Sequence, residues 1–253
     1  MNELGVYRAL LLGWLALALG TFVLLFFVVA PYGRHSRTGW GPSVSQRVGW
    51  ILMEAPASLL FGLFFVLGQW PAAPTSWVFL GLWELHYVYR AFVYPAVIRP
   101  SPKRTPVVVV GMAILFNSVN TYLNGRYLFT LSGGYLSSWL HDPRFLAGSA
   151  LFLLGMVVNH RADAILRGLR RPGDAGYRIP EGFLYRYISC PNYAGEILEW
   201  TGWALATWSW GGVSFLAWTV ANLAPRAWAH HRWYRETFPD YPRTRRALIP
   251  GLW

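Results

Sequence analysis

Two apolar segments of the chain carry polar side chains that can act together on a carbonyl group. Glu54 lies within RVGWILMEAPASLLFG, and Tyr87 lies within LWELHYVYRAFVYP together with Glu84 and Arg90. Since a short connection joins the segments, we expect antiparallel helices with Glu54 and Tyr87 at similar depth. Charged groups in apolar helices usually face an interior or a cavity. A carboxyl group beside a phenol can hydrogen-bond a carbonyl oxygen there. The alternative for Glu54 is a structural acid that reaches toward the interface.

A second group of polar residues lies near the ends of later apolar segments. Asn159 and Asp163 are one helical turn apart, and Arg170 follows on the same face. Asn192 and Glu196 are one turn apart at the start of a further apolar helix. A polar stripe that becomes basic at the membrane surface suits a ligand with a sugar and phosphates. A ladder of ion pairs along one helix is the alternative.

Two further patterns each have two interpretations. Asn117, Asn120 and Asn124 share one helical stripe, where they either join helices or line a cavity. Arginines and aromatic residues fill 167–193 and the chain from residue 230 onward. This composition suits phosphates and a stacked base, and it equally suits a belt of lipid headgroups.

Composition predicts the elements that hold these residues. Of 253 residues, 55% are hydrophobic and only 13% are charged, whereas a soluble domain has about 25% charged residues. Apolar runs of about 20 residues match a hydrocarbon core of about 30 Å, in which backbone amides must pair within a helix. We therefore predict an all-α integral membrane protein with a single domain over 1–253. Seven transmembrane helices are expected, at about 10–30, 48–68, 76–98, 107–129, 145–166, 194–210 and 213–229.

The net charge of +11 is distributed unevenly between the predicted helices. Basic residues concentrate in 31–47, 99–106, 167–193 and 230–253, and the other connections hold few. This alternation follows the positive-inside rule, so it predicts an N-terminus outside and a C-terminus in the cytoplasm. It explains the charge without a nucleic-acid partner. The first apolar run is too long for the core of a cleaved signal peptide.

Several chemistries lack their sequence signatures. The chain has no G-x-G-x-x-G after a strand, no G-x-x-x-x-G-K-S/T and no G-x-S-x-G. The single Cys190 excludes an intramolecular disulfide. His230, His231 and Glu236 are too few for a metal site, because no second cluster has ligand spacing. We therefore predict no metal, and we expect the chemistry to depend on a bound organic cofactor.

Longer strings resemble those of one membrane enzyme family. APYGRHSRTGWGP, WILMEAPAS, ELHYVYRAFVYP and the stretch from YRIPEGFLYRYIS through NYAGEILEW to the ALIPGLW ending resemble the steroid 5α-reductases. The resemblance covers nearly the whole chain. It implies seven membrane helices and NADPH bound from the cytoplasmic side. It also implies reduction of the 4,5 double bond of a 3-oxo-Δ4-steroid, with hydride transfer to C5 and a proton to C4. In this family a Glu and a Tyr hydrogen-bond the 3-keto oxygen, and they correspond to Glu54 and Tyr87.

The resemblance also implies a set of cofactor contacts. They are Tyr32, Tyr94, Asn159, Asp163, Arg170, Tyr177, Asn192, Glu196, Arg226, His230, Tyr234 and Arg245. The chain departs from the family pattern at Met53, where mammalian members often have Gln. Further departures lie near Met112 and at Ile98. These departures leave the exact steroid open.

Partners and location follow from the same resemblance. We expect a steroid substrate such as testosterone or progesterone, a surrounding of membrane lipid, and a monomer. The lack of a long extension and the use of Arg over Lys favour a bacterial inner membrane. A eukaryotic chain would lie in the endoplasmic reticulum membrane. Three alternatives remain: a membrane reductase of trans-2-enoyl-CoA, one of sterol double bonds, and an isoprenylcysteine-type methyltransferase. The methyltransferase would have no use for Glu54 with Tyr87.

Overall fold

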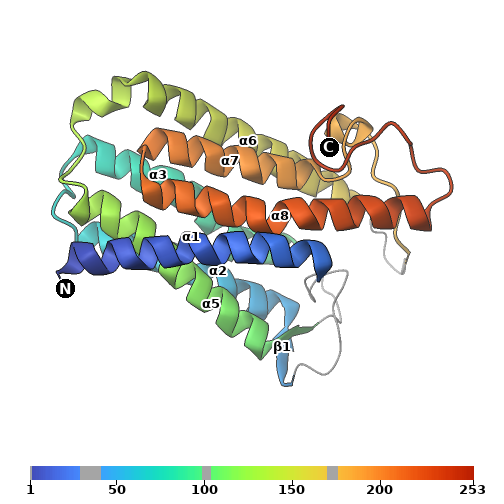
Figure 1. The fold of residues 1–253 in the computed structure, drawn as a ribbon, viewed down its shortest axis with the longest axis horizontal. Coiled ribbons are helices and arrows are strands. Elements are labelled where there is room, and N and C mark those ends of the chain that lie inside the picture. The colour runs from blue at the N-terminus through green and yellow to red at the C-terminus, as the bar shows by residue number, and fades with distance from the viewer. Residues whose placement is uncertain (1, 29–40, 99–103, 170–175) are drawn as a thin grey trace. The chain divides into compact units, whose positions relative to one another are not determined.

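The computed structural model describes residues 2–28, 41–98, 104–169 and 176–253. The described residues are mainly helical, as the long apolar runs predict (Figure 1). The chain divides into two compact units. Unit 1 comprises 1–11, 31–146 and 209–211, and unit 2 comprises 12–30, 147–208 and 212–253. The single domain expected over 1–253 stays a prediction.

Unit 1 contains the start of α1 (Glu3–Phe27) and the whole of α2 (Gln46–Val66). Its further elements are β1 (Ser43–Ser45), α3 (Pro74–Val88), η2 (Tyr89–Val93), α4 (Tyr94–Val97), β2 (Arg104–Pro106), α5 (Val107–Thr121), η3 (Tyr122–Leu131) and η4 (Ser137–His141). The strands pair antiparallel, with Ser43 opposite Pro106. The Ser45 side chain caps α2 by accepting a hydrogen bond from the Val48 amide at 3.3 Å.

Two helices pack on α2 within unit 1. A short connection makes α3 antiparallel to α2, and the Trp83 ring stacks on Phe61 with centroids 4.3 Å apart. In contrast, α5 runs parallel to α2. The Asn117 amide donates to the Met53 carbonyl at 2.6 Å, and further along, a Cβ on Gly125 would lie 3.1 Å from the Phe61 ring. Because α2 carries Glu54, both neighbours help to fix that residue.

Unit 2 contains the rest of α1 together with all or most of three long helices. They are α6 (Pro143–Gly168), α7 (Pro191–Thr207) and α8 (Trp210–Thr237), and the 3-10 turn η5 (Phe183–Arg186) precedes α7. Glycines let α6 and α7 approach closely: Gly148 and Gly155 lie on α6, and Gly195 and Gly202 lie on α7. A Cβ on any of them would lie 2.3 to 2.5 Å from a backbone nitrogen of the other helix. Only glycine fits such a contact.

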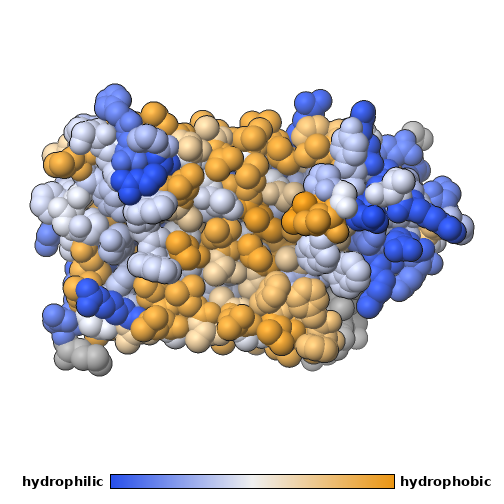
Figure 2. All heavy atoms as spheres, turned by 45° about the horizontal axis from the view of Figure 1, so that its top comes forward, coloured by the Kyte–Doolittle hydropathy of each residue, from blue (hydrophilic) through white to orange (hydrophobic). Residues whose placement is uncertain are grey.

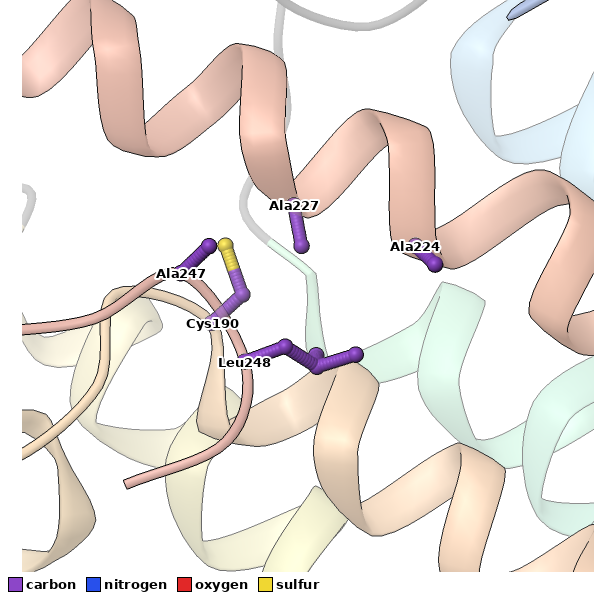
Figure 3. Packing of buried hydrophobic residues seen from close by; sticks show 5 residues of the cluster. All are labelled: Cys190, Ala224, Ala227, Ala247 and Leu248. Carbon is purple, nitrogen blue, oxygen red and sulfur yellow. The ribbon is translucent and has the colours of Figure 1, made fainter. Parts of the chain in front are cut away.

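The last residues of unit 2 fold back onto its helices. We call residues 238–253 the C-terminal strap. Its backbone accepts hydrogen bonds just before α7: the Ser189 amide donates to the Arg246 carbonyl at 2.8 Å, and the Cys190 amide donates to the Ala247 carbonyl at 3.2 Å. Figure 3 shows Ala247 and Leu248 of the strap beside Cys190, facing the alanines of α8 at positions 224 and 227.

Four helical segments of the described residues are long and apolar enough to cross a membrane. They are Glu3–Phe27, Gln46–Val66, Val107–Leu131 and Pro143–Gly168. These segments expose large hydrophobic side chains, among them Leu12, Leu59 and Leu115. Figure 2 shows hydrophobic residues over much of the viewed face. Such a surface suits lipid. A count of seven membrane spans, and the orientation of the termini, stay predictions.

Several helix boundaries differ from the predicted ones: α1 begins at Glu3 and not at residue 10, and α7 begins and ends three residues earlier than predicted. Three further differences concern helices that carry expected site residues or their neighbours. The helix expected at 76–98 is interrupted by the π-helix η2, and the one expected at 107–129 ends in the π-helix η3. The last helix, expected to end at 229, continues to Thr237, so His230 and Tyr234 lie on α8. The prediction follows hydropathy, which falls after 229. Helix formation continues because the polar residues there are compatible with a helix and no Gly or Pro interrupts them.

Candidate active site

Glu54 lies on α2, Tyr87 lies on α3, and Arg90 links the two helices. Oε1 of Glu54 is 3.7 Å from Nη2 of Arg90, one helical turn after Tyr87, and the two side chains are 17% and 16% exposed. Tyr87 is 3% exposed. Its ring packs against those of Trp83 and His86, with centroids 4.9 Å away in both cases. A largely buried ion pair therefore stands one turn from a buried phenol.

Trp50 and Ser58 extend this group, although neither is among the residues expected at the site. The Trp50 indole N–H donates to the Arg90 carbonyl at 2.8 Å, and the Arg90 guanidinium lies 4.9 Å from the Trp50 ring centroid. The Ser58 hydroxyl donates to Oε2 of Glu84 at 2.5 Å. Trp50, Glu54 and Ser58 recur at four-residue spacing and so share one face of α2. That spacing is the sequence signal from which they could be found.

The π-helix η2 places Arg90 and Tyr94 in this group. A π-helical turn adds a residue to the helical register and often occurs at functional sites. The Tyr94 ring lies 5.0 Å from the Trp50 ring and 5.8 Å from the Arg90 guanidinium. Tyr94, an expected cofactor contact, is thus a neighbour of the Glu54–Arg90 pair in unit 1.

Four of the expected cofactor contacts meet at the interface of α6 and α7 in unit 2. The Asn159 amide donates to the Asn192 carbonyl at 2.9 Å and to Oε2 of Glu196 at 3.4 Å. The Asn192 amide donates to Oδ1 of Asp163 at 3.1 Å. The glycine contacts described above hold the two helix backbones together at this level. The spacing within each helix indicates two pairs of residues, and the structure joins them into one network.

Aromatic and basic residues of unit 2 form a second group. The His230 ring lies 5.8 Å from that of Tyr193 near the start of α7, and the Tyr177 ring lies 5.1 Å from that of Trp233. Tyr234 is buried and stacks on Tyr241 at 5.2 Å. Arg226 is partly buried on α8, one turn before His230. Two expected cofactor contacts, Tyr32 and Arg170, lie outside the described residues.

Arg245 differs from an exposed phosphate ligand. It is 5% exposed, its Nη1 donates to the Pro180 carbonyl at 3.0 Å, and its guanidinium lies 5.2 Å from the Tyr241 ring. Within the part of the chain that the structure describes, its Nε is buried and has no hydrogen-bond partner. A buried donor that lacks an acceptor is costly. This N–H is available to a ligand oxygen, such as one of a phosphate.

The chemistry of unit 2 fits a dinucleotide cofactor. Carboxylates and amides such as Asp163, Asn192 and Glu196 can hydrogen-bond ribose hydroxyls and a carboxamide. Aromatic rings can stack on a base, and the unpaired Nε–H of Arg245 suits an anion. The residues present thus match the groups that a nicotinamide dinucleotide displays.

These features define a helical protein with an apolar surface suited to lipid and with groups of buried and partly buried polar residues in each unit. A family model described as 3-oxo-5-alpha-steroid 4-dehydrogenase matches residues 103–253. The chain belongs to this family of steroid 5-alpha-reductases. It is 45% identical over 241 residues to the steroid 5-alpha-reductase DET2 of Gossypium hirsutum, covering 94% of this chain and 93% of the relative. It is 42% identical over 252 residues to the 3-oxo-5-alpha-steroid 4-dehydrogenase 1 of Bos taurus, covering 95% of each.

Proposed function

We propose that this protein reduces the 4,5 double bond of a 3-oxo-Δ4-steroid to the 5α-dihydrosteroid with NADPH. The observation that carries the proposal is the group on α2 and α3: a buried phenol, Tyr87, one turn from the Glu54–Arg90 ion pair. Testosterone and progesterone are the substrates we would try first. The high identity to steroid 5-alpha-reductases over nearly the full length supports the same reaction.

Tyr87 has the main chemical role in this proposal. Addition of hydride at C5 moves negative charge to the 3-keto oxygen as the enolate forms, and the enolate then takes a proton at C4. A phenolic O–H directed at that oxygen stabilises the charge. One such donor contributes about 3–4 kcal/mol to lowering a barrier. The burial of Tyr87 strengthens the effect, because water does not screen the interaction.

Glu54 and Arg90 position the donor. The ion pair joins α2 to the helical run that carries Tyr87, and Trp50 fixes Arg90 through both its N–H and its ring. The Glu54 carboxylate paired with Arg90 has no proton to donate, so Glu54 acts by orienting Tyr87 toward the carbonyl. Because Arg90 and Tyr87 are three residues apart, a change in the ion pair also moves the phenol.

The α6–α7 network holds the cofactor in this proposal. NADPH, when bound, supplies the hydride. Asn159, Asp163, Asn192 and Glu196 bind its polar groups and fix its orientation, and Arg245 offers one N–H to a phosphate. The protein's part in such chemistry is binding, orientation and electrostatics. We propose seven membrane spans with the C-terminus in the cytoplasm, where NADPH is available.

The test is turnover by detergent-solubilised protein. We expect NADPH oxidation that depends on progesterone or testosterone, with the 5α-dihydrosteroid as the product identified by mass spectrometry against 5α and 5β standards. The same preparation is given trans-2-enoyl-CoA and a sterol with a conjugated double bond. If the protein reduced either of these compounds and none of a panel of 3-oxo-Δ4-steroids, the proposal would be wrong. The protein would then be a membrane reductase of trans-2-enoyl-CoA or of sterol double bonds.

A further inference from the structure

A buried hydroxyl in unit 2 joins three parts of the chain that lie far apart in sequence. Ser189 Oγ lies 2.6 Å from Nδ1 of His231 on α8 and 2.7 Å from Oη of Tyr241 on the C-terminal strap. It also donates to the Arg246 carbonyl of the strap at 3.1 Å. We call Ser189, His231 and Tyr241 the serine hub. Nothing in the proposed reaction uses these three residues.

The serine hub does not have the geometry of a catalytic serine nucleophile with a histidine base. Ser189 is 3% exposed, and His231 and Tyr241 are 6% and 5% exposed. A catalytic serine must reach a substrate carbonyl and needs donors for the developing oxyanion. Here the hydroxyl is enclosed by His231, Tyr241 and the Arg246 carbonyl. Its geometry suits a buried link that satisfies polar groups on three segments.

The hub adjoins a short parallel pairing between the chain before α7 and the strap. The Arg246 amide donates to the Tyr187 carbonyl at 3.0 Å, and the Ser189 amide donates back to the Arg246 carbonyl at 2.8 Å. One residue later, Cys190 packs with Ala247 and Leu248 in the cluster of Figure 3. The strap thus fixes the backbone up to the residue that precedes α7.

The start of α7 carries the cofactor network. Cys190 is the residue before the first turn of α7, and Pro191 opens that turn. The next residue is Asn192, whose carbonyl accepts from Asn159 and whose amide donates to Asp163. Asn192 therefore follows Ser189 by three residues. A shift of the chain at Ser189 displaces the Asn192 carbonyl and amide together.

We propose that Ser189 is a positioning residue for the cofactor site. Through Tyr241 and the Arg246 carbonyl it holds the strap against the entry to α7, and through His231 it joins both to α8. These contacts keep Asn192 in register with Asn159 and Asp163. The inference rests on the proposed use of NADPH. It assigns the C-terminal strap a second part in cofactor affinity, besides the N–H that Arg245 offers, although Ser189 itself does not touch the cofactor.

The experiment compares Ser189→Ala, Ser189→Thr and Thr201→Val with the unaltered protein. Thr201 is the matched control, because its hydroxyl donates to the Ile197 carbonyl of its own helix at 2.7 Å. NADPH affinity is measured by fluorescence titration without steroid. Hydrogen exchange of 191–196 is followed in the same samples, and kcat and the KM for steroid are measured at saturating NADPH.

We expect Ser189→Ala to weaken NADPH binding about tenfold and to speed amide exchange over 191–196. At saturating NADPH the kcat should stay within about twofold, and the KM for steroid should not change. Ser189→Thr keeps a hydroxyl and should recover most of the affinity. Thr201→Val should behave as the unaltered protein.

Two outcomes would overturn the inference. The first is unchanged NADPH affinity and exchange in Ser189→Ala. The second is an equal loss of affinity, kcat and thermal stability that Ser189→Thr does not restore, which would reflect general destabilisation. Failure of the proposed function looks different, because the unaltered protein would then bind no NADPH. In that case the exchange of 191–196 in Ser189→Ala still tests the structural link.

Discussion

At the scale of single residues, Tyr87 differs from an ordinary buried tyrosine because its hydroxyl takes part in the proposed reaction. We predict that Tyr87→Phe lowers kcat by at least about 100-fold, since one lost oxyanion donor costs on that order. NADPH affinity should not change. The measurement is steady-state turnover of progesterone together with a fluorescence titration of NADPH.

Tyr122→Phe is the control for that variant. The Tyr122 ring packs against Tyr7 and Phe64 in the same unit, away from the Glu54–Arg90 pair. It should retain near-normal turnover. If Tyr87→Phe turned over as fast as this control, the Tyr87 hydroxyl would have no role in the reaction.

Glu54 is tested by a change that keeps its shape. Glu54→Gln removes the charge that Arg90 faces at 3.7 Å, and we predict a fall in kcat of at least about 100-fold, the scale of a lost transition-state contact. Arg90→Lys keeps the charge and loses the planar group that stacks on Trp50, so a smaller loss is expected. If Glu54→Gln turned over normally, Glu54 would be a structural acid.

The serine hub should make the stability of the protein depend on pH, because it contains His231. Burial lowers the pKa of His231 from its ordinary value of 6.5, and the positive charges of Arg235 and Arg246 lower it further. His231 lies two residues beyond the predicted span 213–229. Because the folded state disfavours the protonated ring, stability is full above about pH 6.5 and falls as the pH drops below this value.

We therefore predict that thermal stability in detergent decreases between pH 7 and pH 5.5 more in the unaltered protein than in His231→Gln. Gln cannot gain a proton in this range. Parallel melting curves at both pH values check this. Equal slopes for the two proteins would mean that other groups cause the acid sensitivity.

At the scale of elements, the approach of α6 and α7 decides where the cofactor network sits. We predict that Gly155→Ala weakens NADPH binding by at least tenfold, because its Cβ would lie 2.3 Å from the Glu199 nitrogen. Overpacking of this kind usually costs about 1–3 kcal/mol and moves the backbone. Thermal unfolding and NADPH titration measure the two effects.

Gly20→Ala on α1 is the control, since nothing lies within 4 Å of its added Cβ. Replacing a helical glycine by alanine at an open position should be neutral or favourable. If both variants behaved alike, close contact of the glycines would not matter for the site.

The sequence predicts the helices better than their details. Long apolar runs indicate each long helix, and four-residue spacing indicates the pairs Asn159–Asp163 and Asn192–Glu196. The π-helices η2 and η3 have no signature in hydropathy, because one extra residue in a turn leaves the apolar pattern nearly unchanged. The link of Ser189 to Tyr241 spans 52 residues, and no local pattern encodes a contact of that range. Trp50 and Ser58 share the spacing of Glu54 on α2, but their residue types are common in ordinary helices.

At the scale of the whole molecule, the seven predicted spans set the side on which each connection lies. We predict that a cysteine at Gln69 reacts with an impermeant maleimide added outside intact cells or right-side-out vesicles, and that one at Glu181 reacts only after permeabilisation. Glu181 and Gln69 are both exposed. The native Cys190 is buried and would be changed to Ala in the background. The reverse labelling pattern would invert the proposed orientation.

The turn between α7 and α8 predicts which bilayer thickness suits the protein. Trp208 adopts a left-handed backbone with φ of 44°, and Trp208 and Trp210 both expose their indoles. Tryptophans of this kind settle at the boundary between headgroups and acyl chains. In the proposed seven-span arrangement α7 crosses the membrane, and its 17 residues extend only about 25 Å, which is less than an average hydrocarbon thickness. Reconstituted into lipids of increasing acyl length, the protein should work best in the thinner membranes, where hydrophobic mismatch is smallest.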